Sequence, residues 1–98
     1  MKHRWTIRPE ADLDIDEAFN WYEDQNAGLG KKFLSELKAS LAVIDSNPLA
    51  FPIIHRNIRR ALIKTFPHAF FYIANEGQII VVACVHHKRD PKVWKRRR

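Results

Sequence analysis

Cations and imidazoles gather in the second half of the chain, on two segments whose composition is typical of strands. Three lie in the first segment and four follow the end of the second: Arg59, Arg60, Lys64, His86, His87, Lys88 and Arg89. In a folded sheet the two groups can converge. Cations stabilise the charge of a phosphate under attack, and histidine exchanges protons near neutral pH. This pattern is typical of a metal-independent ribonuclease, for which His86, His87 and Arg59 are the candidate catalytic residues.

The same residues can instead bind an acidic protein, and the charge distribution fits either partner. Residues 1–49 carry 6 Lys and Arg against 9 Asp and Glu, whereas residues 50–98 carry 11 against 2. A basic half of this kind favours an anionic partner, either nucleic acid or an acidic protein segment. The alternatives are a solvated surface and strand arginines that form surface ion pairs of little energetic value.

Other residues that bind metals or react with substrates lack the spacing that such sites need. The five histidines show no two-histidine helical spacing, so we predict no metal and no cofactor. Cys84 is the only cysteine and lies in an apolar run, which predicts a buried hydrophobe. A group of acids crowds one predicted helix, but helical spacing spreads them over a solvated face. These acids are Glu10, Asp12, Asp14, Asp16, Glu17, Glu23 and Asp24.

The first half of the chain predicts a strand followed by two helices. Residues 2–8 alternate as a short strand, and Pro9 then begins a helix that ends near Asn26. Apolar residues at helical spacing continue after Gly30 and stop before Asn47. Because the connection between the two helices is short and rich in glycine, we expect them to pack antiparallel.

The second half predicts three strands, over residues 58–64, 68–74 and 78–86, of which the last two form a hairpin. The segment 78–86 is apolar at nearly every position, which indicates a central strand covered on both faces. The predicted fold class is therefore α+β, with one domain over residues 1–98. In it an N-terminal strand, an antiparallel helical hairpin and a three-stranded antiparallel meander form one sheet covered by the helices.

The chain end and its tryptophans complete the prediction from residue patterns. Asp90 can cap a short turn that begins at Pro91, before the basic end KVWKRRR. For Trp21 and Trp94 we favour packing over base stacking. No apolar run is long enough to span a bilayer or to serve as a signal peptide, so we expect a cytoplasmic protein.

Several motifs resemble the RelE/ParE toxin superfamily, and in particular its ParE-like plasmid stabilisation members. They occur in the order Trp-Tyr-Glu, Gly-Leu-Gly, Asn-Pro, Phe-Pro and Arg-Asp-Pro-x-x-Trp, and the likeness covers nearly the whole chain. The resemblance implies the toxin of a type II toxin–antitoxin system, with the fold predicted above. It also implies a small cognate antitoxin that wraps the toxin in a hetero-oligomer.

The superfamily contains two activities on one scaffold, so the resemblance leaves two targets. Members similar to ParE inhibit DNA gyrase, and members similar to RelE cleave messenger RNA on the ribosome. Trp94 stands where several nucleases carry an aromatic acid or base, and its ring cannot transfer a proton usefully, which favours gyrase. An inactive interaction module is the third alternative. By this resemblance the target-binding residues are Arg59, Arg60, Lys64, Lys88, Arg89 and Trp94.

Overall fold

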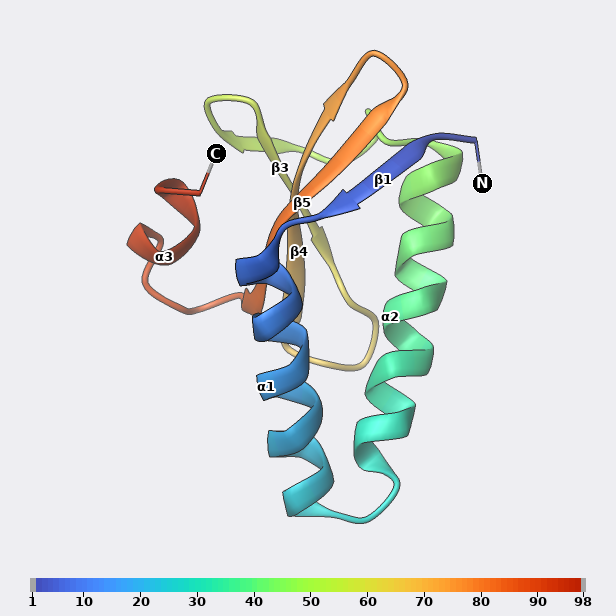
Figure 1. Ribbon diagram of the computed structural model, residues 1–98, viewed down its shortest axis with the longest axis vertical. Helices are drawn as coiled ribbons and strands as arrows, with labels where there is room; N and C mark the ends of the chain where they lie inside the picture. The colour runs from blue at the N-terminus through green and yellow to red at the C-terminus, as the bar shows by residue number, and fades with distance from the viewer. Residues whose placement is uncertain (1, 98) are drawn as a thin grey trace.

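A five-stranded sheet with the strand order β1-β5-β4-β3-β2 runs through the computed structural model, which describes residues 2–97. The elements follow one another as β1 (Arg4–Ile7), α1 (Pro9–Gln25), α2 (Leu29–Ser46), β2 (Ile53–His55), β3 (Ile58–Leu62), β4 (His68–Asn75), β5 (Gln78–His86) and α3 (Lys92–Lys95). β1 pairs parallel to β5, and the other pairs are antiparallel. Figure 1 shows α1 and α2 as a hairpin beside the sheet, with α3 apart from them.

The predicted strand, helical hairpin and antiparallel meander are confirmed, but the structure adds one strand. β2 spans Ile53–His55 and pairs with the outer side of β3. Three residues are too few to show an alternating pattern, and Arg56 ends the strand with a positive φ of 53°. The prediction of three strands after the helices was wrong because β2 owes its conformation to pairing with β3.

Glycines and a glutamate set the close approach of α1 and α2. Gly28 has a φ of +90°, which favours glycine, and its amide donates to Glu23 Oε2 at 3.0 Å. Gly30 donates to Glu23 Oε1 at 2.9 Å, and a Cβ at this position would lie 2.9 Å from the Phe19 ring. The hairpin therefore depends on a residue without a side chain at its narrowest point. In residues 2–97, no helix is both long and apolar enough to cross a membrane.

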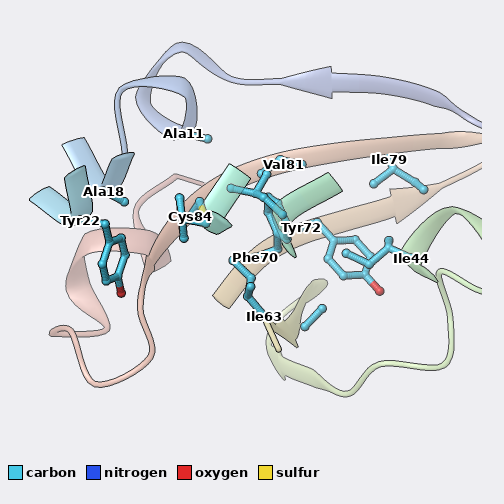
Figure 2. Packing of buried hydrophobic residues seen from close by; sticks show 13 residues of the cluster. Ala11, Ala18, Tyr22, Ile44, Ile63, Phe70, Tyr72, Ile79, Val81 and Cys84 are labelled. Carbon is cyan, nitrogen blue, oxygen red and sulfur yellow. The ribbon is translucent and has the colours of Figure 1, made fainter. Parts of the chain in front are cut away.

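The main core lies between the helical hairpin and one face of the sheet (Figure 2). Phe33 and Leu37 of α2 pack there with Phe70 and Tyr72 of β4. The Tyr72 hydroxyl is buried and donates to the carbonyl of Pro48 at 2.6 Å, and burial raises the pKa of Tyr72 to about 12. The inward alternation of β4 thus fixes both the core and the loop that follows α2.

The second core lies on the opposite face of the sheet, under α3. Trp94 is buried and stacks on Phe71, with ring centroids 4.7 Å apart and an interplanar angle of 15°. A register shift in the β4–β5 ladder leaves Val82 as an extra residue, so that Val82 and Ala83 both join this second core. β5 is therefore central and covered on both faces, as its apolar sequence predicted.

Candidate target-binding site

Three histidines and a tyrosine gather where β4 begins and β5 ends. His68 and His86 are partners in the β4–β5 ladder, and their ring centroids lie 5.9 Å apart. His87 stacks on His86 at 4.9 Å. Across from them, Tyr22 Oη of α1 lies 3.0 Å from His68 Nδ1, within hydrogen-bond distance. The sequence pointed to His86 and His87, but the register adds His68, and the packing of α1 adds Tyr22.

Two pockets open around these four side chains, which we call the histidine cluster. One has a volume of ≈ 190 Å³ and is lined by α1 residues and by Arg89. The other has a volume of ≈ 360 Å³ and is lined by three rings of the cluster, Tyr22, His68 and His86, together with Trp21 and Pro67. Trp21 is 58% exposed and therefore lies outside the core, and its ring packs edge-on against Tyr22. The cluster therefore has aromatic and cationic surface within reach of a ligand.

Burial keeps two members of the histidine cluster, His68 and Tyr22, uncharged at neutral pH. Burial, and secondarily the nearby charge of His86, lowers the pKa of His68 to about 4. Burial also raises the pKa of Tyr22 above its ordinary value. At neutral pH both groups are consequently neutral, and the hydrogen bond between them joins an imidazole to a phenol. His68 cannot act as a cation for a phosphate at that pH.

Arg59 lies elsewhere and serves the loop after α2. Its Nη1 donates to the carbonyls of Leu49 at 3.1 Å and Phe51 at 2.7 Å. In the ladders Arg59 is level with Tyr72 and Val81, whereas His68 is level with His86. At about 3.3 Å per residue this places Arg59 more than ten ångströms along the sheet from the histidine cluster. The structure therefore does not bring Arg59 to His86 and His87.

The other predicted strand cations also separate from one another. Arg59 and Arg60 are consecutive in β3, and successive side chains of a strand point to opposite faces. Lys64 lines a third pocket, between α2 and β3, together with Glu36 and Val43. The seven cations and imidazoles, which the sequence left able to converge, therefore do not all meet, because strand alternation and register divide them.

The cations after β5 remain at the surface, and the tryptophan beyond them does not. Lys88 and Arg89 are exposed, and Arg89 lines the smaller pocket of the histidine cluster. Asp90 Oδ1 accepts from the amide of Lys92 at 3.0 Å, which confirms the predicted cap. Trp94 is 6% exposed, as the packing interpretation predicted, so its ring has little surface to offer a target.

One acid of α1 is buried, against the expectation that all seven lie on a solvated face. Asp14 is 7% exposed and forms an ion pair with Arg97, with Nη1 and Oδ2 2.6 Å apart. Sequence spacing could have predicted the burial of Asp14, because it lies three residues after Ala11 and four before Ala18, on the buried stripe. Within residues 2–97, no three His, Cys, Asp or Glu side chains are grouped as a metal site requires.

Comparison with known proteins identifies the family of this chain. The sequence model described as "ParE toxin of type II toxin-antitoxin system, parDE" matches residues 6–91, which is most of the chain. The chain belongs to the ParE toxin family. The matched residues include both helices of the hairpin, strands β2 to β5 and all four side chains of the histidine cluster, but they end before α3. No curated protein sequence is significantly similar to this ParE-family toxin.

Two solved structures share the fold of this toxin at low sequence identity. The structure titled "Chromosomal ParDE TA system from P. aeruginosa" has a TM-score of 0.75 at 12% identity, and covers 87% of this chain and 96% of that one. A YoeB dimer from Staphylococcus aureus has a TM-score of 0.62 at 22% identity, with 89% and 99% covered. Both likenesses support the RelE/ParE fold. They say nothing of which target the toxin binds, since one scaffold serves both activities.

Proposed function

We propose that this ParE-family toxin inhibits DNA gyrase and is neutralised by a cognate antitoxin. The observation that carries the proposal is the position of Arg59. Its guanidinium is bound by the carbonyls of Leu49 and Phe51, far along the sheet from the histidines. A phosphoryl-cleaving site needs its cations and its acid or base around the same phosphate. The divided arrangement supports binding of a target over cleavage of RNA.

The buried position of Trp94 supports the same proposal. A nuclease that uses a C-terminal aromatic acid or base needs that group at the surface, with a proton to give. Trp94 has an indole N–H that does not ionise usefully, and its ring is stacked on Phe71. The exposed cations Lys88 and Arg89 are suited to contact a large anionic partner such as a complex of gyrase with DNA.

A ribosome-dependent nuclease is the second candidate, and the histidine cluster is the observation that favours it. His86 and His87 are exposed, and His86 lines a pocket together with Arg89. If one of them exchanges a proton with RNA, an alanine at that position should slow cleavage by about two to four orders of magnitude. Its effect on binding should be small by comparison.

The deciding experiment adds purified toxin to gyrase supercoiling reactions and, separately, to translating ribosomes. We expect loss of supercoiling and trapped cleaved DNA, with little change in His86→Ala or His87→Ala. Combined alanines at Lys88 and Arg89 should weaken inhibition through lost contacts. The proposal fails if excess toxin leaves supercoiling untouched while codon-specific cuts in messenger RNA appear and vanish in the histidine variants. Absence of both activities, with no growth arrest on expression, would indicate an inactive interaction module.

The antitoxin is the partner that the family implies, and it should cover the helical hairpin together with part of the basic sheet. Two exposed apolar side chains, Val43 of α2 and Leu62 of β3, flank a pocket that also holds Lys64. An amphipathic acidic segment fits such a surface. Its association rate should fall as salt rises, because long-range attraction is screened. Co-expression from the native operon followed by purification tests this, and recovery of the toxin without a small partner would contradict it.

A further inference from the structure

Two side chains bind the backbone of β5 beyond the point where its neighbouring strand, β1, ends. β1 ends at Ile7, which pairs with Val81, and the amide of Arg8 donates to the Val81 carbonyl at 3.1 Å. Farther along this strand, Asp14 Oδ2 accepts from the amide of Cys84 at 3.1 Å. Arg97 Nη1 donates to the carbonyl of Val82 at 3.3 Å. An acid of α1 and a cation from the chain end thus bind the backbone of β5 beyond the end of β1.

These two side chains also bind each other, forming what we call the Asp14–Arg97 latch. Arg97 Nη1 lies 2.6 Å from Asp14 Oδ2, and Nη2 lies 3.5 Å from Oδ1. The Asp14 side chain is 6% exposed and that of Arg97 is 18% exposed. Arg8 in addition donates to the main-chain carbonyl of Arg97. The latch thus fixes the side chain of Arg97, and Arg8 fixes its backbone, at the very end of the described chain.

The latch is the second of two anchors for the C-terminal segment. The first is Trp94, which stacks on Phe71 on the face of the sheet opposite α1. A helix of four residues has no stability of its own, so the anchors must hold α3 in place. Around them lie exposed cations: Lys88, Arg89, Lys92, Lys95 and Arg96. Two anchors set the direction of the helix and therefore the direction in which Lys92, Lys95 and Arg96 point.

We propose that Asp14 is a positioning residue for target recognition. Through Arg97 it holds the basic C-terminal segment in the orientation that contacts the complex of gyrase with DNA. The role rests on the proposed gyrase function and adds to it a residue that touches no target. Asp14 is itself buried and carries a charge of the wrong sign for an anionic partner, so we assign its effect to the orientation of Arg97 rather than to a contact with the target.

Substitution of Asp14 by asparagine separates this role from simple electrostatics. Asp14→Asn makes the protein more positive, so attraction to an anionic target by charge alone would become stronger. Release of the latch predicts the opposite, because only a fraction of the molecules would then hold the segment correctly. If that fraction falls to a tenth, inhibition weakens about ten-fold. Asp12→Asn is the matched control, since Asp12 is an exposed acid of the same helix and gives the same change of charge.

A second pair of variants keeps the test valid if Asp14→Asn fails to fold. Arg97→Met and Arg96→Met remove the same charge from neighbouring residues, but only Arg97 belongs to the latch. We expect the larger loss of gyrase inhibition in Arg97→Met. Amide hydrogen exchange should rise over residues 91–97 in both latch variants and stay unchanged in β4 and in β5, apart from the Cys84 amide that Asp14 binds directly.

The outcomes separate this proposal from the gyrase function on which it rests. If the wild-type toxin does not inhibit gyrase, both proposals fail together. If the wild type inhibits and Asp14→Asn inhibits equally or more strongly, only the positioning role is overturned. The same holds if exchange over residues 91–97 does not change, or if it rises while inhibition stays at the wild-type level. Weaker inhibition with faster exchange over residues 91–97, in a variant whose β4 and β5 amides other than that of Cys84 keep their protection, supports it.

Discussion

Two buried acids of the helical hairpin, Asp14 and Asp45, fasten opposite ends of the chain by different means. Asp45, near the end of α2, accepts from the amide of Lys2 at 2.7 Å and from Trp5 Nε1 at 2.9 Å. His3 adds its amide at 3.2 Å and its ring nitrogen at 3.3 Å. Asp14 instead binds a backbone amide of β5 and a guanidinium from the other end of the chain. One acid therefore collects mostly neutral donors, and the other neutralises a cation.

The difference follows from where each acid lies in its helix. A carboxylate in the last turn of α2 meets the negative end of the helix dipole, so Asp45 needs several donors to remain charged. These donors, first among them the Lys2 amide, hold the pKa of Asp45 well below its usual value. Asp14 lies within α1 and is one half of an ion pair. Asp45 thus fixes the first strand beside β5, whereas Asp14 ties the Arg97 guanidinium to the core.

Substitution in the core under the helical hairpin should give the largest loss in the free energy of unfolding. Leu37→Ala should lower the free energy of unfolding by about 2 to 5 kcal/mol, because a buried side chain is replaced by a cavity. Leu37 is 5% exposed, whereas Leu13 is 61% exposed and provides the control. Leu13→Ala should change the free energy of unfolding by less than about 0.5 kcal/mol. Urea unfolding measures both, and equal losses would show that the helix faces are misplaced.

Asp14→Ala should be the next largest effect, a loss of about 1 to 3 kcal/mol in the free energy of unfolding. The Cys84 amide would lose its partner, whereas Arg97 can turn toward solvent. For this reason the loss should stay below that of a fully buried ion pair. Asp12→Ala serves as the control in the same unfolding experiment. Asp14 would have no more than a surface role if its substitution proved as mild as that of Asp12.

The titration of His68 predicts a loss of stability in mild acid. In the unfolded chain its imidazole gains a proton below pH 6.5 or so, whereas the folded protein keeps it neutral down to about pH 4. The unfolded state therefore binds more protons in this window, and the melting temperature should fall as the pH is lowered through it. His68→Gln should flatten that part of the curve. A wild-type melting temperature that is constant between these pH values would contradict the assignment.

Asp45 predicts the smallest effect, confined to stronger acid. Its folded pKa is depressed, so its stabilisation is complete above the unfolded value of about 4 and is lost as the pH falls below it. Asp45→Asn should remove this acid-dependent part and leave the His68 window in place. Thermal melts from pH 7 to pH 2 measure both regions in one series. Loss of both regions in Asp45→Asn would mean that the two groups are coupled.

Local sequence patterns were sufficient for most of the elements. Helical spacing of apolar residues gave the bounds of α1 and α2 nearly to the residue, and the continuous apolar run of β5 predicted its central position. It also predicted that Cys84 is buried, and burial indeed raises the pKa of its thiol. These features depend on neighbours a few residues apart, which a single segment contains. The basic second half and the ordered motifs likewise belong to the sequence alone.

The tertiary structure decided which of several similar residues take part in the site. The sequence offered seven acids in α1 and placed Asp14 on the apolar stripe, but only the tertiary structure pairs it with a residue 83 positions away. It offered Arg59 and His86 as partners, but strand register separates them and brings His68 to His86 instead. The physical reason is that burial and charge pairing depend on which distant segments meet. That outcome is fixed by sheet register and helix packing, and no short stretch of sequence contains it.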